Sequence, residues 1–327
     1  MDDPIRWGVL GASNFALNRM VPAIHTARGH CVAALGTRDA AKAEPFRAKV
    51  GELRVHDSYD AVLDDPEVDA VYVPLPHTLH VEWATKALRA GKHVLVEKPV
   101  AMHADEIAPL IAARDETGLV CAEAYMIVHH PQWHRVRALL AEGTVGALRH
   151  VDGVFTYDNS SDPGNIRNLA ATGGGALPDI GVYSYGSVRW ATGLEPEEIT
   201  HADIDWEGGC DVLSRVSARF PGFSAHFVNS MRLMPAQSVT FHGDAGLIRM
   251  TAPFNAGVFD VARIEIHGRN TVAVERWTEP NQYVLQVEAF GAAVRGEAAF
   301  PWTLEDARGT QAMIDAVYAK AGGRPDG

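Results

Sequence analysis

The chain has 327 residues, 47% of them hydrophobic and 21% charged, and its formal net charge is −12. This length is sufficient for two domains, and the composition is typical of a globular protein rather than a disordered one. The acidic balance, without any lysine- or arginine-rich run, disfavours binding to nucleic acids or anionic membranes, because both need a positive protein face.

The first 125 residues alternate short apolar runs with amphipathic stretches. Strands are predicted at Arg6–Leu10, His30–Leu35, Ala70–Leu75, His93–Val96 and Leu119–Tyr125. Helices are predicted between them at Phe15–Ala27, Ala40–Val50, Leu79–Arg89 and Ala104–Thr117. Near-continuous apolar strands separated by helices indicate a parallel sheet that is covered on both faces. We therefore predict an α/β, doubly wound domain of the Rossmann type over residues 1–122.

The pattern changes past Pro131. Helices are predicted at Gln132–Glu142, Val182–Thr192, Tyr283–Val294 and Thr303–Ala321. Strands, several with period-two alternation, are predicted at Leu148–Tyr157, Leu213–Phe220, Ser224–Asn229, Ser238–His242, Leu247–Thr251, Ala262–His267 and Thr271–Arg276. Residues 123–327 should thus form an α+β domain with a large open, mostly antiparallel sheet. An open sheet needs a cover for its second face, so we expect a homodimer or homotetramer formed through this sheet.

The turn after the first predicted strand has the character of a phosphate-binding loop. It reads Gly11, Ala12, Ser13, Asn14, Phe15 and Ala16. A Rossmann turn needs glycine for the tight turn and small residues for phosphate approach and helix packing. The first and third positions fit, and Ser13 replaces the second glycine with a hydroxyl that can donate to a phosphate oxygen. Helix N-terminal amides supply further donors, which predicts dinucleotide binding.

The end of the second strand indicates which dinucleotide is bound. NAD-binding domains carry an acid about 20 residues after the first glycine, which binds the ribose 2′-hydroxyl. Here the strand ends in Thr37 and Arg38, with Lys42 one turn later, and these groups suit a 2′-phosphate. The alternative is that Thr37 or Asp39 caps the next helix and Arg38 is a solvated charge. We favour NADP(H) over NAD(H).

The third and fourth strands also end in polar residues at the edge where open α/β sheets bind ligands. The third leads into Leu75, Pro76 and His77, with His80 following. The fourth ends in Glu97-Lys98-Pro99. A lysine at this edge is a candidate for stabilising a developing alkoxide, and Glu97 for orienting it. The alternative for Lys98 is a strand-end side chain that extends to solvent.

A second candidate element lies in the other predicted domain. Three glycines, Gly173 to Gly175, imply a close backbone approach and precede a helix. Asp179 and Tyr183 are four residues apart, so they share one face of that helix. A phenol at this place can transfer a proton if a nearby lysine lowers its pKa. The alternative is that Asp179 caps the helix and Tyr183 belongs to the core.

These motifs together resemble the Gfo/Idh/MocA family of nicotinamide-dependent oxidoreductases, over essentially the whole chain. The resemblance is to the branch with tyrosine, not histidine, at the position of Tyr183. That branch includes glucose–fructose oxidoreductase, dimeric dihydrodiol dehydrogenase and some NADP-dependent xylose dehydrogenases. It implies hydride transfer between NADP(H) and a secondary alcohol or ketone of a sugar or cyclic diol. Lys98 would stabilise the oxygen, and Tyr183 would pass the proton with Asp179 beside it.

The resemblance also implies roles for other residues. His77 and Tyr283 would lie near the cofactor, His80 would support that loop, and Glu97 would bind the nicotinamide ribose. Arg167 would reach the cofactor or the substrate, while Tyr157 and Asn165 would contact substrate. One departure is Val128, where relatives tend to carry arginine before the His129-His130-Pro131 string. Family members often have a cis peptide before the proline of the Glu-Lys-Pro tripeptide.

Other readings remain beside this one. Some relatives are glycosidases that use tightly bound NAD in a transient oxidation, and others are non-catalytic cofactor sensors. The presence of both Lys98 and Tyr183 argues against a sensor. No metal site is predicted, because His129, His130 and His134 lack an acid or cysteine at ligand spacing. A cytoplasmic location is expected, because the sequence shows neither a signal peptide nor an apolar run of about 20 residues.

Overall fold

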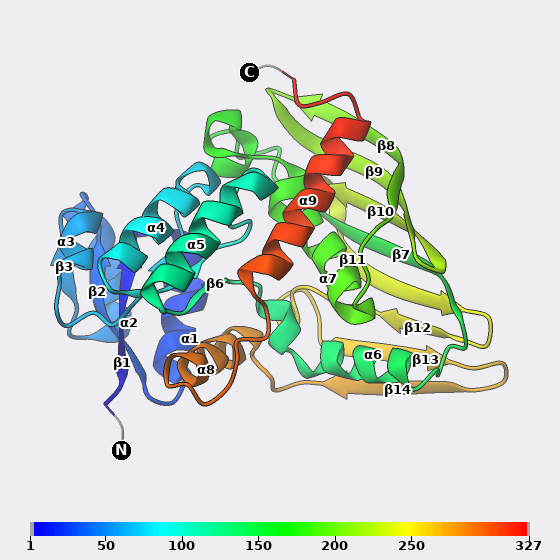
Figure 1. Cartoon of the computed structure of the whole chain (residues 1–327), viewed down its shortest axis with the longest axis horizontal. Coiled ribbons are helices and arrows are strands. Elements are labelled where there is room, and N and C mark those ends of the chain that lie inside the picture. The colour runs from blue at the N-terminus through cyan, green and yellow to red at the C-terminus, as the bar shows by residue number, and fades with distance from the viewer. Residues whose placement is uncertain (1–2, 326–327) are drawn as a thin grey trace. The chain divides into compact units, whose positions relative to one another are not determined.

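The computed structural model describes residues 3–325 and contains two compact units (Figure 1). Unit 1 comprises residues 1–101, 105–126 and 281–307, and unit 2 comprises residues 102–104, 127–280 and 308–327. The predicted division between residues 122 and 123 falls close to residue 126, where the second segment of unit 1 ends. It differs in residues 281–307, which follow the second sheet in the sequence but pack with the first.

Unit 1 contains a six-stranded parallel sheet in the order β3-β2-β1-β4-β5-β6, which is the doubly wound Rossmann order. Its strands are β1 Ile5–Leu10, β2 His30–Gly36, β3 Arg54–His56, β4 Ala70–Val73, β5 His93–Val96 and β6 Cys121–Glu123. Apart from the edge strand β3, the strands are mostly buried, as expected where helices cover both faces. The prediction of a Rossmann-type parallel sheet is confirmed.

The helices of unit 1 form two groups. They are α1 Val21–Thr26, α2 Glu44–Val50, α3 Tyr59–Leu63, α4 His80–Arg89, α5 Ile107–Thr117 and α8 Gln282–Val294. A π turn, Ala16–Met20, leads into α1, and short 3₁₀ turns occur at Ala40–Ala43 and His77–Leu79. Side chains of α3, α4 and α5 share one apolar core with the strands. On the other side, Trp7 of β1 contacts Phe290 of α8 with ring centroids 4.9 Å apart, which explains why α8 joins unit 1.

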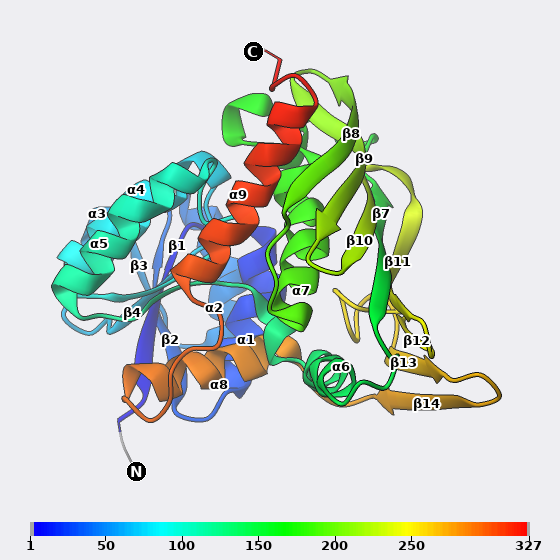
Figure 2. The same cartoon turned by 45° about the vertical axis from the view of Figure 1, so that its right-hand side comes forward.

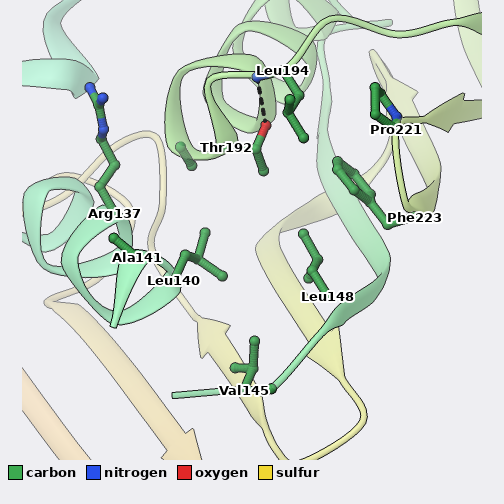
Figure 3. Close-up of a pocket in the computed structure, with 11 residues that line it drawn as sticks. Arg137, Leu140, Ala141, Val145, Leu148, Thr192, Leu194, Pro221 and Phe223 are labelled. Atoms are coloured by element: carbon green, nitrogen blue, oxygen red, sulfur yellow. Dashed lines mark hydrogen bonds between the residues drawn. The ribbon is translucent and has the colours of Figure 1, made fainter. Parts of the chain in front are cut away.

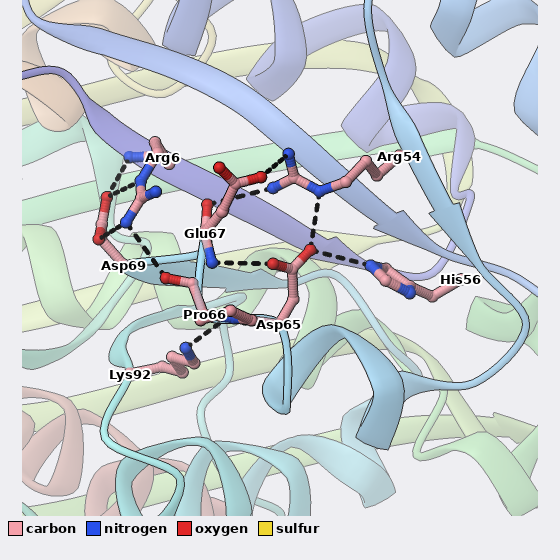
Figure 4. A network of polar contacts seen from close by, with 8 residues as sticks. All are labelled: Arg6, Arg54, His56, Asp65, Pro66, Glu67, Asp69 and Lys92. Atoms are coloured by element: carbon pink, nitrogen blue, oxygen red, sulfur yellow. Dashed lines mark hydrogen bonds and ion pairs between the residues drawn. The ribbon is translucent and has the colours of Figure 1, made fainter.

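The amino ends of these strands carry a network of ion pairs (Figure 4). Arg6 binds both carboxylate oxygens of Asp69 at 2.8 and 2.9 Å. Asp65 accepts from Arg54 Nε at 2.9 Å and from the backbone N–H of Glu67 at 2.8 Å. Because ligands bind at the carboxyl ends of parallel strands, this network belongs to the structural edge of the sheet.

Unit 2 is built on an eight-stranded sheet in the order β14-β13-β12-β11-β7-β10-β9-β8. The strands are β7 Leu148–Asp158, β8 Glu198–Glu207, β9 Cys210–Phe220, β10 Phe223–Ser230, β11 Arg232–Gly243, β12 Leu247–Met250, β13 Ala262–His267 and β14 Val272–Trp277. The β7–β10 pair is parallel and every other neighbouring pair is antiparallel. The predicted mostly antiparallel sheet is confirmed.

Helices of unit 2 lie on one side of this sheet (Figure 2). α6, Pro131–Ala141, contacts β13 and β14, and α7, Val182–Thr192, contacts β7. A π turn, Leu177–Gly181, leads directly into α7, and α9, Leu304–Lys320, enters unit 2 after Ala307. The opposite sheet face exposes alternate side chains of the central strands, among them His150, Asp152, His226 and His242.

Two strands, β3 and β8, escape prediction from the sequence. β3 has three residues and lies at the sheet edge, so it lacks the apolar run that marks the other strands. β8 is also an edge strand, and most of its residues are polar and partly exposed. Edge strands are often short or charged because this limits pairing with other chains, and the same property hides them in the sequence.

Candidate active site

The loop after β1 has the geometry expected of a dinucleotide turn. Gly11 has φ of 108°, and a Cβ there would lie 3.1 Å from Leu75 and 3.3 Å from the Tyr59 hydroxyl, so glycine is required. The Ser13 hydroxyl accepts a hydrogen bond from the backbone N–H of Ala16 at 3.0 Å and thereby begins the following helix. Its own proton remains available for an acceptor such as a phosphate oxygen.

The tip of β2 combines features of both alternatives considered from the sequence. Asp39 caps the next turn by accepting from the backbone N–H of Ala41 at 3.0 Å, and the Thr37 hydroxyl bonds to the backbone of Asp39. Arg38 and Lys42 remain exposed on the same turn. Asp39 thus provides the cap, while Arg38 and Lys42 are positive groups at the surface that can bind an anionic group.

His80 has a structural place beneath the loop that follows β4. It is fully buried, and its Nδ1 and Nε2 lie 2.8 Å from the carbonyl oxygens of Pro99 and Leu75. A neutral imidazole has a single N–H, so it donates to one of these carbonyls at a time. Burial above all lowers the pKa of His80, to about 4. His80 therefore supports the loop and has no exposed surface.

Other predicted cofactor residues gather at the carboxyl edge of the sheet in unit 1. The Tyr72 hydroxyl of β4 donates to Glu97, directly after β5. The ring of Tyr283, at the start of α8, meets Phe15 edge-on with centroids 5.8 Å apart. Burial and then the charge of Glu97 raise the pKa of Tyr283. His77 is also buried at this edge, in the turn before α4.

Lys98 follows at the end of β5 and is 8% exposed. The Lys98-Pro99 peptide bond is cis, as the family resemblance implies. Glu123, which sequence reasoning missed, is a fully buried carboxyl at the end of the neighbouring strand β6, and it interacts electrostatically with Lys98. The available signal was an acid within the apolar run Cys121 to Met126, next to the strand that carries the lysine.

The glycine run in unit 2 permits close backbone packing within the protein. A Cβ at Gly174 would lie 2.4 Å from the carbonyl oxygen of Arg167, and one at Gly175 would lie 2.0 Å from an oxygen of Asp211. Asp211, not Asp179, binds the start of the helix, by accepting from the backbone N–H of Leu177 at 2.6 Å. The alternative interpretation, in which Asp179 caps this helix, is therefore not needed.

Asp179 lies at the centre of a polar cluster. Tyr157 and Arg167, which are also candidates from the sequence, bind its two oxygens. Its Oδ2 accepts from the Tyr157 hydroxyl at 2.6 Å, and its Oδ1 lies 3.0 Å from Nε of Arg167. The charge of Asp179 is the main cause of the raised pKa of Arg167, and Tyr157 and Tyr183 contribute in the same direction. The structure thus brings together Tyr157, Arg167, Asp179 and Tyr183.

The ring of Tyr183 is buried among aromatic side chains. Phe155 of β7 and Phe254 lie beside it, with ring centroids 5.9 and 6.0 Å away. The side chain of Asn165 accepts from the backbone N–H of Arg167 at 3.1 Å and donates to Asp162, and its contact with substrate stays a prediction. It therefore shapes the turn that presents Arg167.

The histidine-rich segment before α6 also has a structural use. His130 caps α6 by accepting from the backbone N–H of Gln132 at 3.1 Å, and His129 is buried. Within residues 3–325, no group of three or more His, Cys, Asp or Glu side chains is arranged to hold a metal ion. Over the same residues, no helix combines the length and apolar character needed to cross a bilayer.

Unit 2 also contains a cavity of about 410 Å³ (Figure 3), and its lining residues include none of this cluster. It is lined mainly by apolar side chains, including Leu140, Leu148 and Phe223, and by Ala191 and Thr192 at the end of α7. Tyr183 lies in the first turn of that helix, so at 1.5 Å per residue Ala191 is roughly 12 Å further along it. The cavity and the polar cluster are therefore distinct features of unit 2.

Comparisons with known proteins identify the family to which this chain is similar. Residues 5–125 match the family model described as "Oxidoreductase family, NAD-binding Rossmann fold", and residues 133–249 match the "GFO/IDH/MocA C-terminal domain". The chain is 34% identical to dTDP-3,4-didehydro-2,6-dideoxy-alpha-D-glucose 3-reductase of Actinomadura kijaniata, over 98% of this chain and 96% of the relative. It is 29% identical to D-xylose 1-dehydrogenase (NADP(+)) 2 of Haloferax volcanii, over 96% and 97% of the two chains.

A solved structure shows the same fold. The 3-ketoreductase KijD10 from Actinomadura kijaniata, in complex with NADP and TDP-benzene, has a TM-score of 0.90 and 32% sequence identity, over 97% of this chain and 98% of that one. Both halves of the chain match family models, and relatives match along its whole length. The chain therefore belongs to the Gfo/Idh/MocA family of oxidoreductases.

Proposed function

We propose that this protein is an NADP(H)-dependent oxidoreductase that interconverts a ketone and a secondary alcohol on a sugar. The observation that carries the proposal is the cluster around Tyr183. A buried phenol lies in the first turn of α7, four residues after an aspartate that holds a guanidinium at 3.0 Å. A phenol with a cation nearby can give up and recover a proton near neutral pH, which carbonyl reduction requires.

The choice of NADP(H) rests on the tip of β2. Arg38 and Lys42 are exposed there, and the acid nearby, Asp39, already accepts a backbone N–H at 3.0 Å. Gly11 permits the tight turn after β1, and the Ser13 hydroxyl can donate its proton to a phosphate oxygen at this loop. KijD10 was solved with NADP, and the xylose dehydrogenase relative is named for NADP(+). When bound, the nicotinamide supplies or accepts the hydride.

Lys98 and Tyr183 divide the remaining work in this proposal. In the direction of reduction, Tyr183 donates its hydroxyl proton to the substrate oxygen. Lys98 stabilises the negative charge that develops on that oxygen. Arg167 carries a positive charge within unit 2, which favours the phenolate that remains after proton transfer. Oxidation of the alcohol uses the same groups in reverse.

The substrate class that we propose rests on the names of the relatives, because carbonyl reduction itself does not distinguish one ketone from another. The related reductase is named for a dTDP-linked keto sugar, and the other relative is named for xylose. We propose a keto sugar, with nucleotide-linked sugars tested first because that relative has the higher identity over the whole chain. Trans-dihydrodiols form the second group, as the family resemblance implies.

The test is a substrate panel followed through the absorbance of the reduced nicotinamide. Nucleotide-linked keto sugars, free aldoses and trans-dihydrodiols are each offered with NADP(H) and with NAD(H). Sustained turnover of a sugar with NADP(H), faster than with NAD(H), is expected. A cofactor that stays bound through purification without net turnover would instead identify a glycosidase with a transient redox step. Failure to bind either nicotinamide would overturn the proposal.

A further inference from the structure

Glu123 is a buried carboxyl group beside the proposed catalytic lysine, and the mechanism above does not use it. It ends β6 and is 1% exposed. In the parallel pairing of β5 and β6, Glu123 lies opposite Val96, two residues before Lys98. Acids are rarely buried this completely unless paired or hydrogen-bonded, so its partners are informative.

Both carboxyl oxygens of Glu123 accept hydrogen bonds from N–H groups. Oε1 accepts from the backbone N–H of Val100 at 2.9 Å, and Oε2 accepts from Nε1 of Trp302 at 2.8 Å. The indole is held in place by stacking on Tyr125, with ring centroids 4.2 Å apart. Two N–H donors facing two oxygens suit the carboxylate, which has no proton to place between them.

The bond to Val100 links Glu123 to the backbone that carries Lys98. Val100 follows Lys98 by two residues, and the carbonyl of the intervening Pro99 lies 2.8 Å from His80 Nδ1. The lysine segment is therefore held from two sides, by α4 through His80 and by β6 through Glu123. Both supports come from buried ionisable side chains.

The groups around Glu123 shift its pKa in opposite directions. Burial raises its pKa to about 7, Glu97 adds to this effect, and the Trp302 and Val100 hydrogen bonds and the charge of Lys98 reduce it. Lys98 and Glu97 come from the end of β5, and neutral His80 comes from α4. A carboxyl in this environment changes its charge near neutral pH.

We propose that Glu123 is a positioning residue for Lys98: its carboxylate fixes the 98–100 segment through the Val100 N–H and supplies a buried counter-charge to the lysine ammonium. Protonation of Glu123 from solvent removes the counter-charge and weakens both hydrogen bonds. This inference rests on the proposed function, because it assigns Lys98 a role in turnover. The fall of kcat on the acid side of the pH–rate profile then follows the protonation of Glu123.

The first test compares pH–rate profiles of wild type, Glu123→Gln and Trp302→Phe. Wild-type kcat should fall as pH drops through about 7. Glu123→Gln should lose this limb and show a plateau reduced by up to about 100-fold, the effect of a misplaced catalytic group. Trp302→Phe keeps a stacking ring but removes one donor to the carboxylate. Its acid limb should move to higher pH by about one to two units, as expected for one lost charge-assisted hydrogen bond.

The second test does not depend on activity. The pKa of Glu123 is raised in the folded state above its ordinary value of 4.5, so the proton is bound more tightly in the folded state. The stability from this group is present below pH of about 4.5 and is lost as pH rises through about 7. The Tm of wild type should therefore fall relative to that of Glu123→Gln as pH rises through this window. Infrared difference spectra should show a protonated carboxyl C=O band that Glu123→Gln lacks.

The outcomes separate this inference from the proposed function. If Lys98 variants keep activity but the Tm difference changes with pH as described, the proposed function fails and the titration of Glu123 stands. An acid limb of kcat that is the same in wild type, Glu123→Gln and Trp302→Phe would overturn the positioning role. A Tm difference that does not change between about pH 5 and 8 would overturn the titration itself.

Discussion

Nε of Arg167 lies 3.0 Å from Oδ1 of Asp179, and the other oxygen of the same carboxylate accepts a hydrogen bond from the Tyr157 hydroxyl at 2.6 Å. Asp179 is therefore already occupied by two partners of its own unit. Its geometry is that of an anchor for Arg167, one turn before Tyr183, rather than that of a proton acceptor for substrate. The chemistry at Tyr183 should then depend on Asp179 through Arg167.

Replacement of Asp179 by Asn should lower kcat by about 10- to 100-fold, because a displaced charge near the reacting group weakens its stabilisation. Tyr157→Phe leaves the ion pair intact and should have a smaller effect, below about tenfold. Steady-state kinetics of the two variants provide the comparison. If Tyr157→Phe is as damaging as Asp179→Asn, the phenol of Tyr157 itself contacts substrate and the anchor role is wrong.

Cofactor preference should depend on Arg38. Arg38→Ala should raise the KM for NADP(H) by about 10- to 100-fold while leaving the KM for NAD(H) nearly unchanged, because one charge-assisted phosphate contact is lost. Lys42→Ala, one turn further along, is the matched control and should have a weaker effect in the same direction. A wild-type enzyme that already prefers NAD(H) would contradict the interpretation of the β2 tip.

The ion-pair network at the amino edge of the first sheet should stabilise the fold without affecting chemistry. Burial works against the charge of Asp65, but hydrogen bonds from Glu67 N–H, Arg54 and His56 outweigh it and lower its pKa to about 2. A depressed folded-state pKa gives stability that is present above the ordinary value of 3.8 and lost as pH falls through about 2.

Asp65→Asn should therefore reduce the free energy of unfolding at pH 7 by about 1–3 kcal/mol, with less effect near pH 2. Denaturant unfolding at both pH values measures this. Glu67→Gln, whose exposed carboxylate also binds Arg54, should change stability by about 0.5 kcal/mol or less. Equal losses of unfolding free energy in the two variants would show that the burial of Asp65 does not strengthen its contacts.

Much of this fold can be predicted from the sequence, for identifiable reasons. The buried strands of unit 1 are continuous apolar runs, and the helices between them show period 3.6, so β1, β2, β4 and β5 are visible in the sequence. The edge strands β3 and β8 are not, because they are short or polar. The placement of α8 also escapes prediction, since the Trp7–Phe290 contact joins residues far apart in the chain.

The candidate site divides in the same way. Lys98 and Tyr183 stand in recognisable motifs, and the structure places Tyr183 beside Arg167 as a cluster. The glycine run predicts a close approach, but only the structure shows that the approaching atoms belong to Arg167 and Asp211. Glu123 and Asp211 are single acids without a motif, and their partners Trp302 and Tyr318 lie far along the chain. Such pairs carry no local sequence signal.

Self-association through the open face of the second sheet remains a prediction. Val154 and Val228 are neighbours in the β7–β10 pair and are partly exposed on that face, beside polar side chains such as Asp152 and His226. A dimer packed on this face should be lost in Val228→Arg, which places a charge at its centre. Light scattering at micromolar concentration measures the change, and a wild-type monomer would remove the prediction.

The central claim is that Lys98 and Tyr183 act on one substrate oxygen. Lys98→Met should lower kcat at least as much as Tyr183→Phe, while cofactor binding stays measurable. Because the two groups serve one step, the double variant should lose less than the product of the two single losses. Independent effects that multiply fully would place the lysine and the tyrosine in separate steps.

The most direct measurement is kcat of Tyr183→Phe with saturating sugar substrate and NADP(H), beside Tyr185→Phe as the control. Tyr185 is a buried phenol two residues further along the same helix, so its substitution removes an equivalent hydroxyl outside the cluster. The account predicts a loss of about 10²- to 10⁴-fold in Tyr183→Phe, the contribution of a positioned acid–base group, and near-wild-type turnover in Tyr185→Phe. Turnover of Tyr183→Phe close to that of wild type would contradict it.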